Sequence, residues 1–334
     1  MQDIILKIKT MFAKAADFLK SGGLKRFCKK TFETIARKFK DRSLVSLVVS
    51  WWHLLLAGLF VFLILYYPIG AFMTHDIDKN FDFNAAANQK NQTQILETQA
   101  ALIDREVNKH TFTPNLPFFY PSAVLDNMPA YQTGVIDGLR VIAKAFADAM
   151  PDSRYLQKAA EALQADPTVW YFSDKPIANR QYLAARHYLE KAVEEINSGA
   201  GIPSTVPAAI LEAQIAGLEN AMEDIKKTLP VYNDSPANAE ADEVFYRIQG
   251  ESYVFYLTLR DLPVDFPEFA VNEAAMRFYK ESLKTLKAAL TFDPLIIRNA
   301  APDSFFAPNH LSSLGFYLSE AQNDLQAVLR TLNK

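Results

Sequence analysis

The chain has 334 residues, half of them hydrophobic, and its formal net charge of −3 conceals a strong asymmetry along the sequence. Residues 1–43 carry 12 Lys and Arg against 4 Asp and Glu, residues 44–67 carry none of these four, and the rest is acidic, with 23 basic and 34 acidic residues. Charges of opposite sign on the two sides of an apolar gap are typical of a membrane protein. The single cysteine, Cys28, excludes disulfides and thiol catalysis from everything after the gap.

Residues 1–43 are predicted to form cytoplasmic basic amphipathic helices. Apolar side chains recur at helical spacing among lysines, with a break at Ser21-Gly22-Gly23. Such helices beside a membrane span commonly lie on the anionic inner leaflet. The alternative is a solvated basic flank with no specific task. No nucleic-acid-binding fold is recognisable, so a nucleic-acid partner is not expected.

Residues 44–73 are predicted to be a transmembrane anchor in the lipid bilayer. About 20 apolar residues are needed to cross roughly 30 Å of hydrocarbon, and the run exceeds this length. The crossing occupies either 46–67 or 51–73. Four aromatic side chains near its two ends are predicted to lie at the membrane interfaces: Trp51, Trp52, Tyr66 and Tyr67. The alternative is a buried helix of a soluble protein.

The flanks of the apolar run predict its orientation. Lys38, Lys40 and Arg42 precede it, whereas the first basic residue after it is Lys79. The positive-inside rule then places residues 1–43 in the cytoplasm and the bulk of the chain outside. The long basic segment fits an uncleaved anchor better than a signal peptide.

Residues 74–110 are predicted to be a stalk and a first helix, running from near Ala85 to about Val107. The segment 111–130 contains Pro114, Pro117, Pro121 and Pro129, which predicts an extended strap. The simplest interpretation of its aromatic triplet is packing of the strap onto the core, and the alternative is docking of a partner protein. The triplet consists of Phe118, Phe119 and Tyr120.

The remainder, within a periplasmic helical domain at 111–334, shows one helical pattern after another and no run of alternating short strands. The predicted fold class is therefore all-α, a single N-terminal transmembrane helix followed by an extracytoplasmic multi-helix bundle. The last helix carries a heptad seam from Leu311 to Leu332. We expect it to pack inside its own bundle, with a homodimer through this helix as the alternative.

The stretch 241–266 looks most like a chemical site. Glu243, Arg247 and Glu251 lie four residues apart, which on a helix places two carboxylates and a guanidinium on one face. The simpler interpretation is an ion-pair ladder on a half-exposed face. The sharper interpretations are a catalytic pair, Glu243 and Glu251, or a partner-binding role for Arg247. The segment 253–259 would also suit a short strand.

No other chemistry is indicated by motif. The sequence contains no G-x-S-x-G, H-E-x-x-H or C-x-x-C, so no cofactor and no metal site are expected. His75 with Asp76 and Asp78 could hold a weak cation, but a solvated polar collar after the span is the expected arrangement.

Four sequence blocks, in this order, resemble the uncharacterised bacterial family catalogued as domain of unknown function 2333. These blocks are LDNMPAYQTGV at 125–135, NRQYLAARHYLEKA at 179–192, DEVFYRIQGESY at 242–253 and NHLSSLGFYLSEAQNDL at 309–325. The resemblance implies a membrane-anchored protein of the Gram-negative envelope, located in the bacterial inner membrane. It implies no activity and no role for any residue.

The sequence therefore predicts a non-enzymatic membrane protein whose periplasmic domain binds an envelope protein partner or scaffolds an envelope assembly. Two alternatives remain at this level: a cell-wall glycan hydrolase with Glu243 or Glu251 as the acid, and a helical bundle that binds a lipid or small ligand with helix 253–259 lining its pocket.

Overall fold

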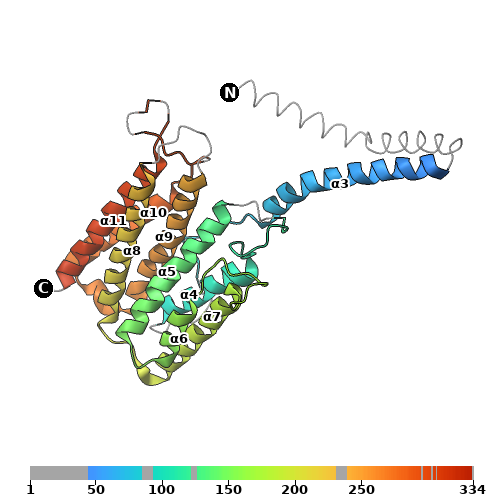
Figure 1. Cartoon of the computed structure of the whole chain (residues 1–334). Helices are drawn as coiled ribbons and strands as arrows, with labels where there is room; N and C mark the ends of the chain where they lie inside the picture. The colour runs from blue at the N-terminus through green and yellow to red at the C-terminus, as the bar shows by residue number, and fades with distance from the viewer. Residues whose placement is uncertain are drawn as a thin grey trace, which may run out of the picture. The chain divides into compact units, whose positions relative to one another are not determined.

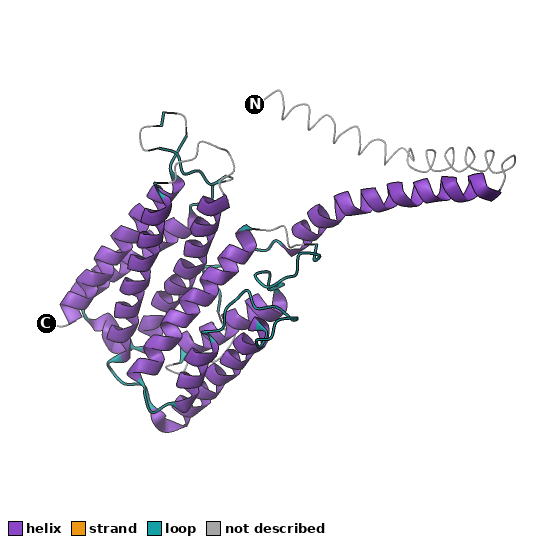
Figure 2. Ribbon diagram, viewed as in Figure 1, coloured by secondary structure: helices purple, strands orange, loops and turns teal. Residues whose placement is uncertain are grey.

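A computed structural model describes residues 44–84, 93–121, 126–230, 239–294, 296–301, 304–305 and 307–332. The predicted cytoplasmic helices at 1–43 and the predicted helix start near Ala85 lie outside these residues. The chain divides into two compact units, Met1–Tyr66 and Tyr67–Lys334. Within the described residues the regular structure is helical, as the sequence predicts (Figure 2).

The helix α3 runs from Leu44 to Thr74 and contains the apolar segment (Figure 1). Its part from Trp51 to Thr74 is long and apolar enough to cross a membrane. Side chains along this part are largely exposed, as lipid-facing side chains would be, and unlike those of a core helix.

Eight further α-helices are described in the second unit. Their bounds are α4 Gln94–Asp104, α5 Asn127–Ala149, α6 Arg154–Ala162, α7 Ala178–Glu195, α8 Val206–Thr228, α9 Ala239–Asp265, α10 Glu273–Thr291 and α11 His310–Leu332. Short π-helical turns extend α4 (Arg105–Lys109) and α7 (Ile196–Ala200), and a 3-10 turn, Pro267–Val271, precedes α10. The predicted loop 230–239 falls almost wholly outside the described residues.

Helix α9 lies at the centre of the unit, where it packs on α5, α4, α8 and α10. Helices α10 and α11 pair on one side, and α4, α6 and α7 form a second group (Figure 1). The segment 253–259 is helical, so the alternative of a short strand there is wrong. Its aromatic and branched side chains are buried in the core, because neighbouring helices surround α9.

Glycines let α5 and α9 approach unusually closely. A Cβ on Gly134 would lie 1.8 Å from the carbonyl oxygen of Arg247, and one on Gly250 would lie 2.1 Å from that of Tyr131. Because no other residue type leaves this space, the backbones of α5 and α9 meet directly at these points.

The heptad side chains of α11 face inward. Leu311, Leu314, Leu318, Ala321, Leu325 and Val328 are all buried. The expectation that this seam packs inside its own bundle is confirmed for the described residues, since α11 packs on α10 and α8. A dimer through α11 would have to use its outer face, where Phe316 is exposed.

The strap is irregular from His110 to Pro121, but its predicted last residues already belong to α5. The prediction that Pro129 excludes a helix there is wrong. Proline is tolerated in the first turn of a helix, where its missing N–H would have no intrahelical partner. The Asp126 side chain accepts a hydrogen bond from the Asn127 N–H at this terminus.

The N-terminus of helix α4 is capped by a residue that is distant in the sequence. The two carboxylate oxygens of Asp265, at the end of α9, accept hydrogen bonds from the N–H groups of Gln94 and Ile95 at 2.7 and 2.9 Å. These are N–H groups without an intrahelical acceptor, so α9 supplies the N-terminal cap of α4. Burial raises the pKa of Asp265 to about 7, although both hydrogen bonds favour its ionised form.

Candidate functional site

The segment that follows α3, residues 75–84, is fastened to the bundle through its backbone. Tyr131 donates a hydrogen bond to the carbonyl of Asp78 (2.9 Å), and Tyr253 donates one to the carbonyl of Asn80 (2.7 Å). Arg260 donates to two further carbonyls of this segment. The predicted stalk is therefore part of the folded domain in its described portion.

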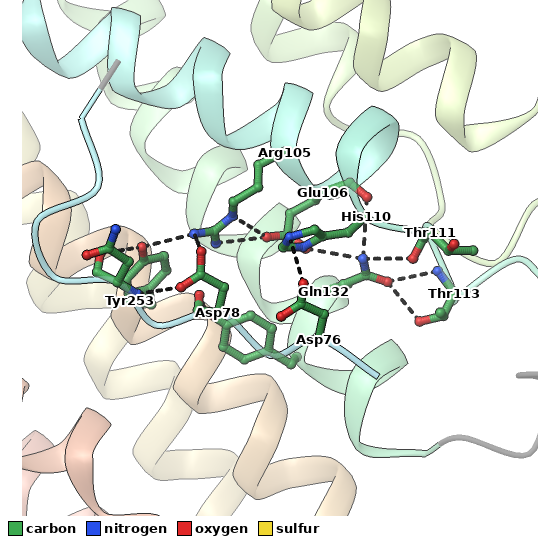
Figure 3. A network of polar contacts seen from close by, with 11 residues as sticks. Asp76, Asp78, Arg105, Glu106, His110, Thr111, Thr113, Gln132 and Tyr253 are labelled. Carbon is green, nitrogen blue, oxygen red and sulfur yellow. Dashed lines mark hydrogen bonds and ion pairs between the residues drawn. The ribbon is translucent and has the colours of Figure 1, made fainter. Parts of the chain in front are cut away.

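A buried ion pair lies beneath this segment (Figure 3). Arg105 is 3% exposed and Glu106 is fully buried, and the two side chains meet at 2.8 Å. The guanidinium also donates to Asp78 Oδ2 and to the Tyr253 hydroxyl, both at 3.1 Å. It lies over the rings of Phe83 and Tyr253 as well. A buried charge pair is tolerated best when further hydrogen bonds satisfy both partners, and here they satisfy Nε and Nη1 of Arg105 but not Nη2.

The network extends from Glu106 to His110 and Asp76. Glu106 Oε2 lies 3.6 Å from His110 Nδ1, and His110 Nε2 lies 3.3 Å from Asp76 Oδ2. The contact with Glu106 raises the pKa of His110, against the effect of partial burial. Burial alone would raise the pKa of Glu106, but His110 and Arg105 outweigh it and the pKa is lowered.

Gln132 of α5 connects the network to the strap (Figure 3). Its side-chain N–H donates to Glu106 Oε2 and to the Thr111 carbonyl, both at 3.1 Å. Its carbonyl oxygen accepts from the backbone N–H and the hydroxyl of Thr113, both at 2.8 Å. The post-span segment, α4, α5, α9 and the strap thus meet at one buried polar centre.

The π-helical turn at the end of α4 produces this convergence. The His110 N–H bonds to the Arg105 carbonyl at 2.8 Å across five residues, which widens the turn. Arg105, Glu106 and His110 are thereby brought to the same side of the chain. Such turns are rare and occur often at functional positions.

The structure places the charged residues of 241–266 differently from the predicted ladder. Arg247 pairs with Asp224 of α8 and, at 3.8 Å, with Asp137 of α5, while Arg140 contacts Asp137 at 2.5 Å. The sequence-predicted partner-binding residue Arg247 is thus engaged between helices. The ladder prediction is wrong because the facing helices offer carboxylates with better geometry than the residues one turn away.

Glu243 and Glu251 are not brought together. Glu243 is exposed, whereas Glu251 is half-buried, its Oε1 lying 3.3 Å from the position of a Cβ on Gly217. Burial raises the pKa of Glu251 to about 8, and the neighbouring Asp137 adds to this effect. Burial also raises the pKa of Asp137.

The aromatic triplet of the strap is exposed. Phe118, Phe119 and Tyr120 are 81%, 50% and 40% exposed, so the prediction that they pack onto the core is wrong. Phe112 packs the strap onto the core instead. It is buried, and its ring centroid lies 5.5 Å from that of Tyr182. In α3, Trp51 and Trp52 are exposed, whereas Tyr66 and Tyr67 are half-buried.

Sequence reasoning missed Arg105, Glu106 and Gln132. Asp76 is exposed, as expected of a solvated collar, although it pairs with His110, and Asp78 is half-buried beside Arg105. One signal was available. Glu106 lies four residues after Leu102, on the apolar stripe of the predicted helix, where a carboxylate requires a buried partner. Among the described residues, no group of three or more His, Cys, Asp or Glu side chains is arranged to hold a metal ion.

Comparisons of the chain with protein-family models, curated proteins and solved structures found no match.

Proposed function

We propose that the chain is a non-enzymatic anchor protein of a bacterial inner membrane, with residues 1–43 cytoplasmic and a periplasmic helical domain that binds a protein partner or scaffolds an envelope assembly. The proposed family relationship supports this location. The proposed orientation follows from the basic residues that precede α3.

One observation carries the scaffolding proposal, the fastening of residues 75–84 to the bundle. Only His75 separates the end of α3 from Asp76, the first residue of this segment with a partner in the buried network. The segment that leaves α3 is therefore part of the folded domain, which supports a domain held close to its anchor. The ion pair of Arg105 and Asp78 at 3.1 Å and the two tyrosine hydrogen bonds hold residues 78–80 against the helices of this domain.

The test is crosslinking in intact cells followed by mass spectrometry of the tagged full-length chain. We expect repeated crosslinks to one envelope protein. Inserting about ten Gly and Ser residues between Thr74 and His75 should abolish them, because a flexible linker then separates residues 75–84, and the domain to which they are fastened, from α3.

The matched control carries the same insertion between Asn233 and Asp234, which leaves the connection to α3 unchanged. Crosslinks that reach only the chain itself, or that persist with the insertion after Thr74, would contradict the proposal.

A second function, glycan hydrolysis, is favoured by the pKa of Glu251, since a general acid must hold its proton near neutral pH. Glu251→Gln should then abolish function in cells while leaving folding intact. The ligand-binding alternative has less support, because Tyr253, Phe255 and Leu257 are buried among other side chains.

A further inference from the structure

Five exposed aromatic side chains and the half-buried Trp170, from two loops, form a surface that we call the aromatic patch. The strap contributes Phe118, Phe119 and Tyr120, and the loop between α6 and α7 contributes Trp170, Tyr171 and Phe172. Tyr171 and Phe172 are each 71% exposed. Exposed aromatic side chains gathered at one place mark an interaction surface.

The two loops are held together by hydrogen bonds. The side-chain N–H of Asn115 donates to the Val169 carbonyl at 3.0 Å and to Asn179 Oδ1 at 2.6 Å. Trp170 and Phe118 line the same small groove. The patch is therefore one surface built from two separate segments.

The patch is attached to the last turns of α3. The Tyr67 hydroxyl donates to the Phe118 carbonyl at 3.1 Å. A Cβ on Gly70 would lie 2.0 Å from Cβ of Pro121, so the strap crosses directly over the glycine backbone. Phe72 and Met73, on the following turn, are exposed apolar side chains.

The residues of α3 that contact the strap, Tyr67 and Gly70, lie near the outer end of either predicted crossing. If the crossing occupies 46–67, Tyr67 marks the outer edge of the hydrocarbon. If it occupies 51–73, Tyr67 lies about 9 Å inside that edge, at 1.5 Å per residue. Both registers place the strap at or below the headgroup level. Lipid-exposed irregular backbone does not occur within hydrocarbon, so the strap favours the first register.

The chemistry of the patch fits the interface between lipid and water. Residues 111–121 and 167–173 carry no Asp, Glu, Lys or Arg. Tyrosine and tryptophan prefer this zone because each has an apolar body and a polar tip. We propose that the aromatic patch lies in the headgroup region of the outer leaflet, so that the domain contacts the bilayer at a second place besides α3. This inference rests on the proposed membrane anchoring.

Trp170 makes the proposal measurable, because the only other tryptophans are Trp51 and Trp52. The full-length W51F/W52F variant retains Trp170 alone and is placed in phosphatidylcholine nanodiscs. Lipids brominated near the headgroup should quench at least half of the Trp170 emission, and bromines at the chain ends should quench far less.

The matched control is the W51F/W52F/W170F variant with Phe316→Trp, whose new side chain replaces an exposed aromatic on α11. Its emission should be unaffected by either lipid. Trp170 emission that is equally unaffected by the brominated lipids would overturn the proposal. Protection of Trp170 from iodide in native membranes but not in nanodiscs would also overturn it, because a protein would then cover the patch.

A failure of the anchoring itself is distinguishable. The W170F variant reports from Trp51 and Trp52 alone, and neither shallow nor deep bromines would quench it if α3 did not enter the bilayer.

Discussion

Gly250 of α9 lies against the backbone of Tyr131 of α5, so close that a Cβ on the glycine would be 2.1 Å from the tyrosine carbonyl oxygen. The same Tyr131 holds the Asp78 carbonyl with its hydroxyl. The packing of the two central helices and the fastening of the post-span segment therefore depend on one residue.

Gly250→Ala should destabilise the domain by about 1–3 kcal/mol, because the backbones must separate to admit the methyl group. The matched control is Gly315→Ala on α11, where a Cβ would make only ordinary contacts of 3.5 Å with Ile225. That change should stabilise by about 0.5–1 kcal/mol through helix propensity. Thermal unfolding followed by circular dichroism in nanodiscs measures both, and equal effects of the two substitutions would argue against close packing.

Removing one partner of the buried ion pair should lower the free energy of unfolding more than removing both partners. Arg105→Met leaves Glu106 uncompensated and should destabilise by about 3–5 kcal/mol, whereas R105M/E106M should recover part of this loss. Lys144→Met, which breaks an exposed pair with Asp148, should have little effect. Urea unfolding of the four proteins gives the comparison. A double variant less stable than R105M would show that Glu106 contributes without its partner.

Glu251 should make stability fall as pH rises. Its folded pKa of about 8 lies above its ordinary value of 4.5, so its contribution is complete below about pH 4.5 and is lost as pH rises through 8. Glutamine at position 251 is neutral at every pH. Glu251→Gln should therefore remove the decrease in stability, about 1.4 kcal/mol per pH unit, between pH 4.5 and 8. Asp265 titrates in the same range, so some dependence remains. Glu243→Gln, at an exposed position, is the control.

His110 should also make stability depend on pH, at the upper end of the same pH range. Its raised pKa means that its contribution is complete below pH 6.5 and disappears as pH rises through the folded value. Glu106, whose pKa is lowered, stays charged throughout this interval. His110→Gln should flatten the unfolding temperature against pH above 6.5. The exposed His187 provides the control, and an identical profile for H187Q would count against the role of His110.

The regular elements were predictable because their signals are local. The heptad side chains of α11 and the Ser-Gly-Ala-Gly stop after α7 are visible within a few residues of sequence. The buried polar centre could not be predicted, because Arg105 bonds to Tyr253, which lies almost 150 residues further along the chain. The exposure of Phe118 was missed for a related reason. An aromatic run carries the same pattern whether it faces a core or a membrane.

The cap that Asp265 places on α4 has a consequence for the order of folding. The acceptor for the first N–H groups of the domain lies about 170 residues downstream of them. A chain that emerges N-terminus first therefore cannot form this cap on α4 until most of the domain has followed. Contacts of such long sequence separation slow folding. The domain is thus kept from closing before most of its chain is available.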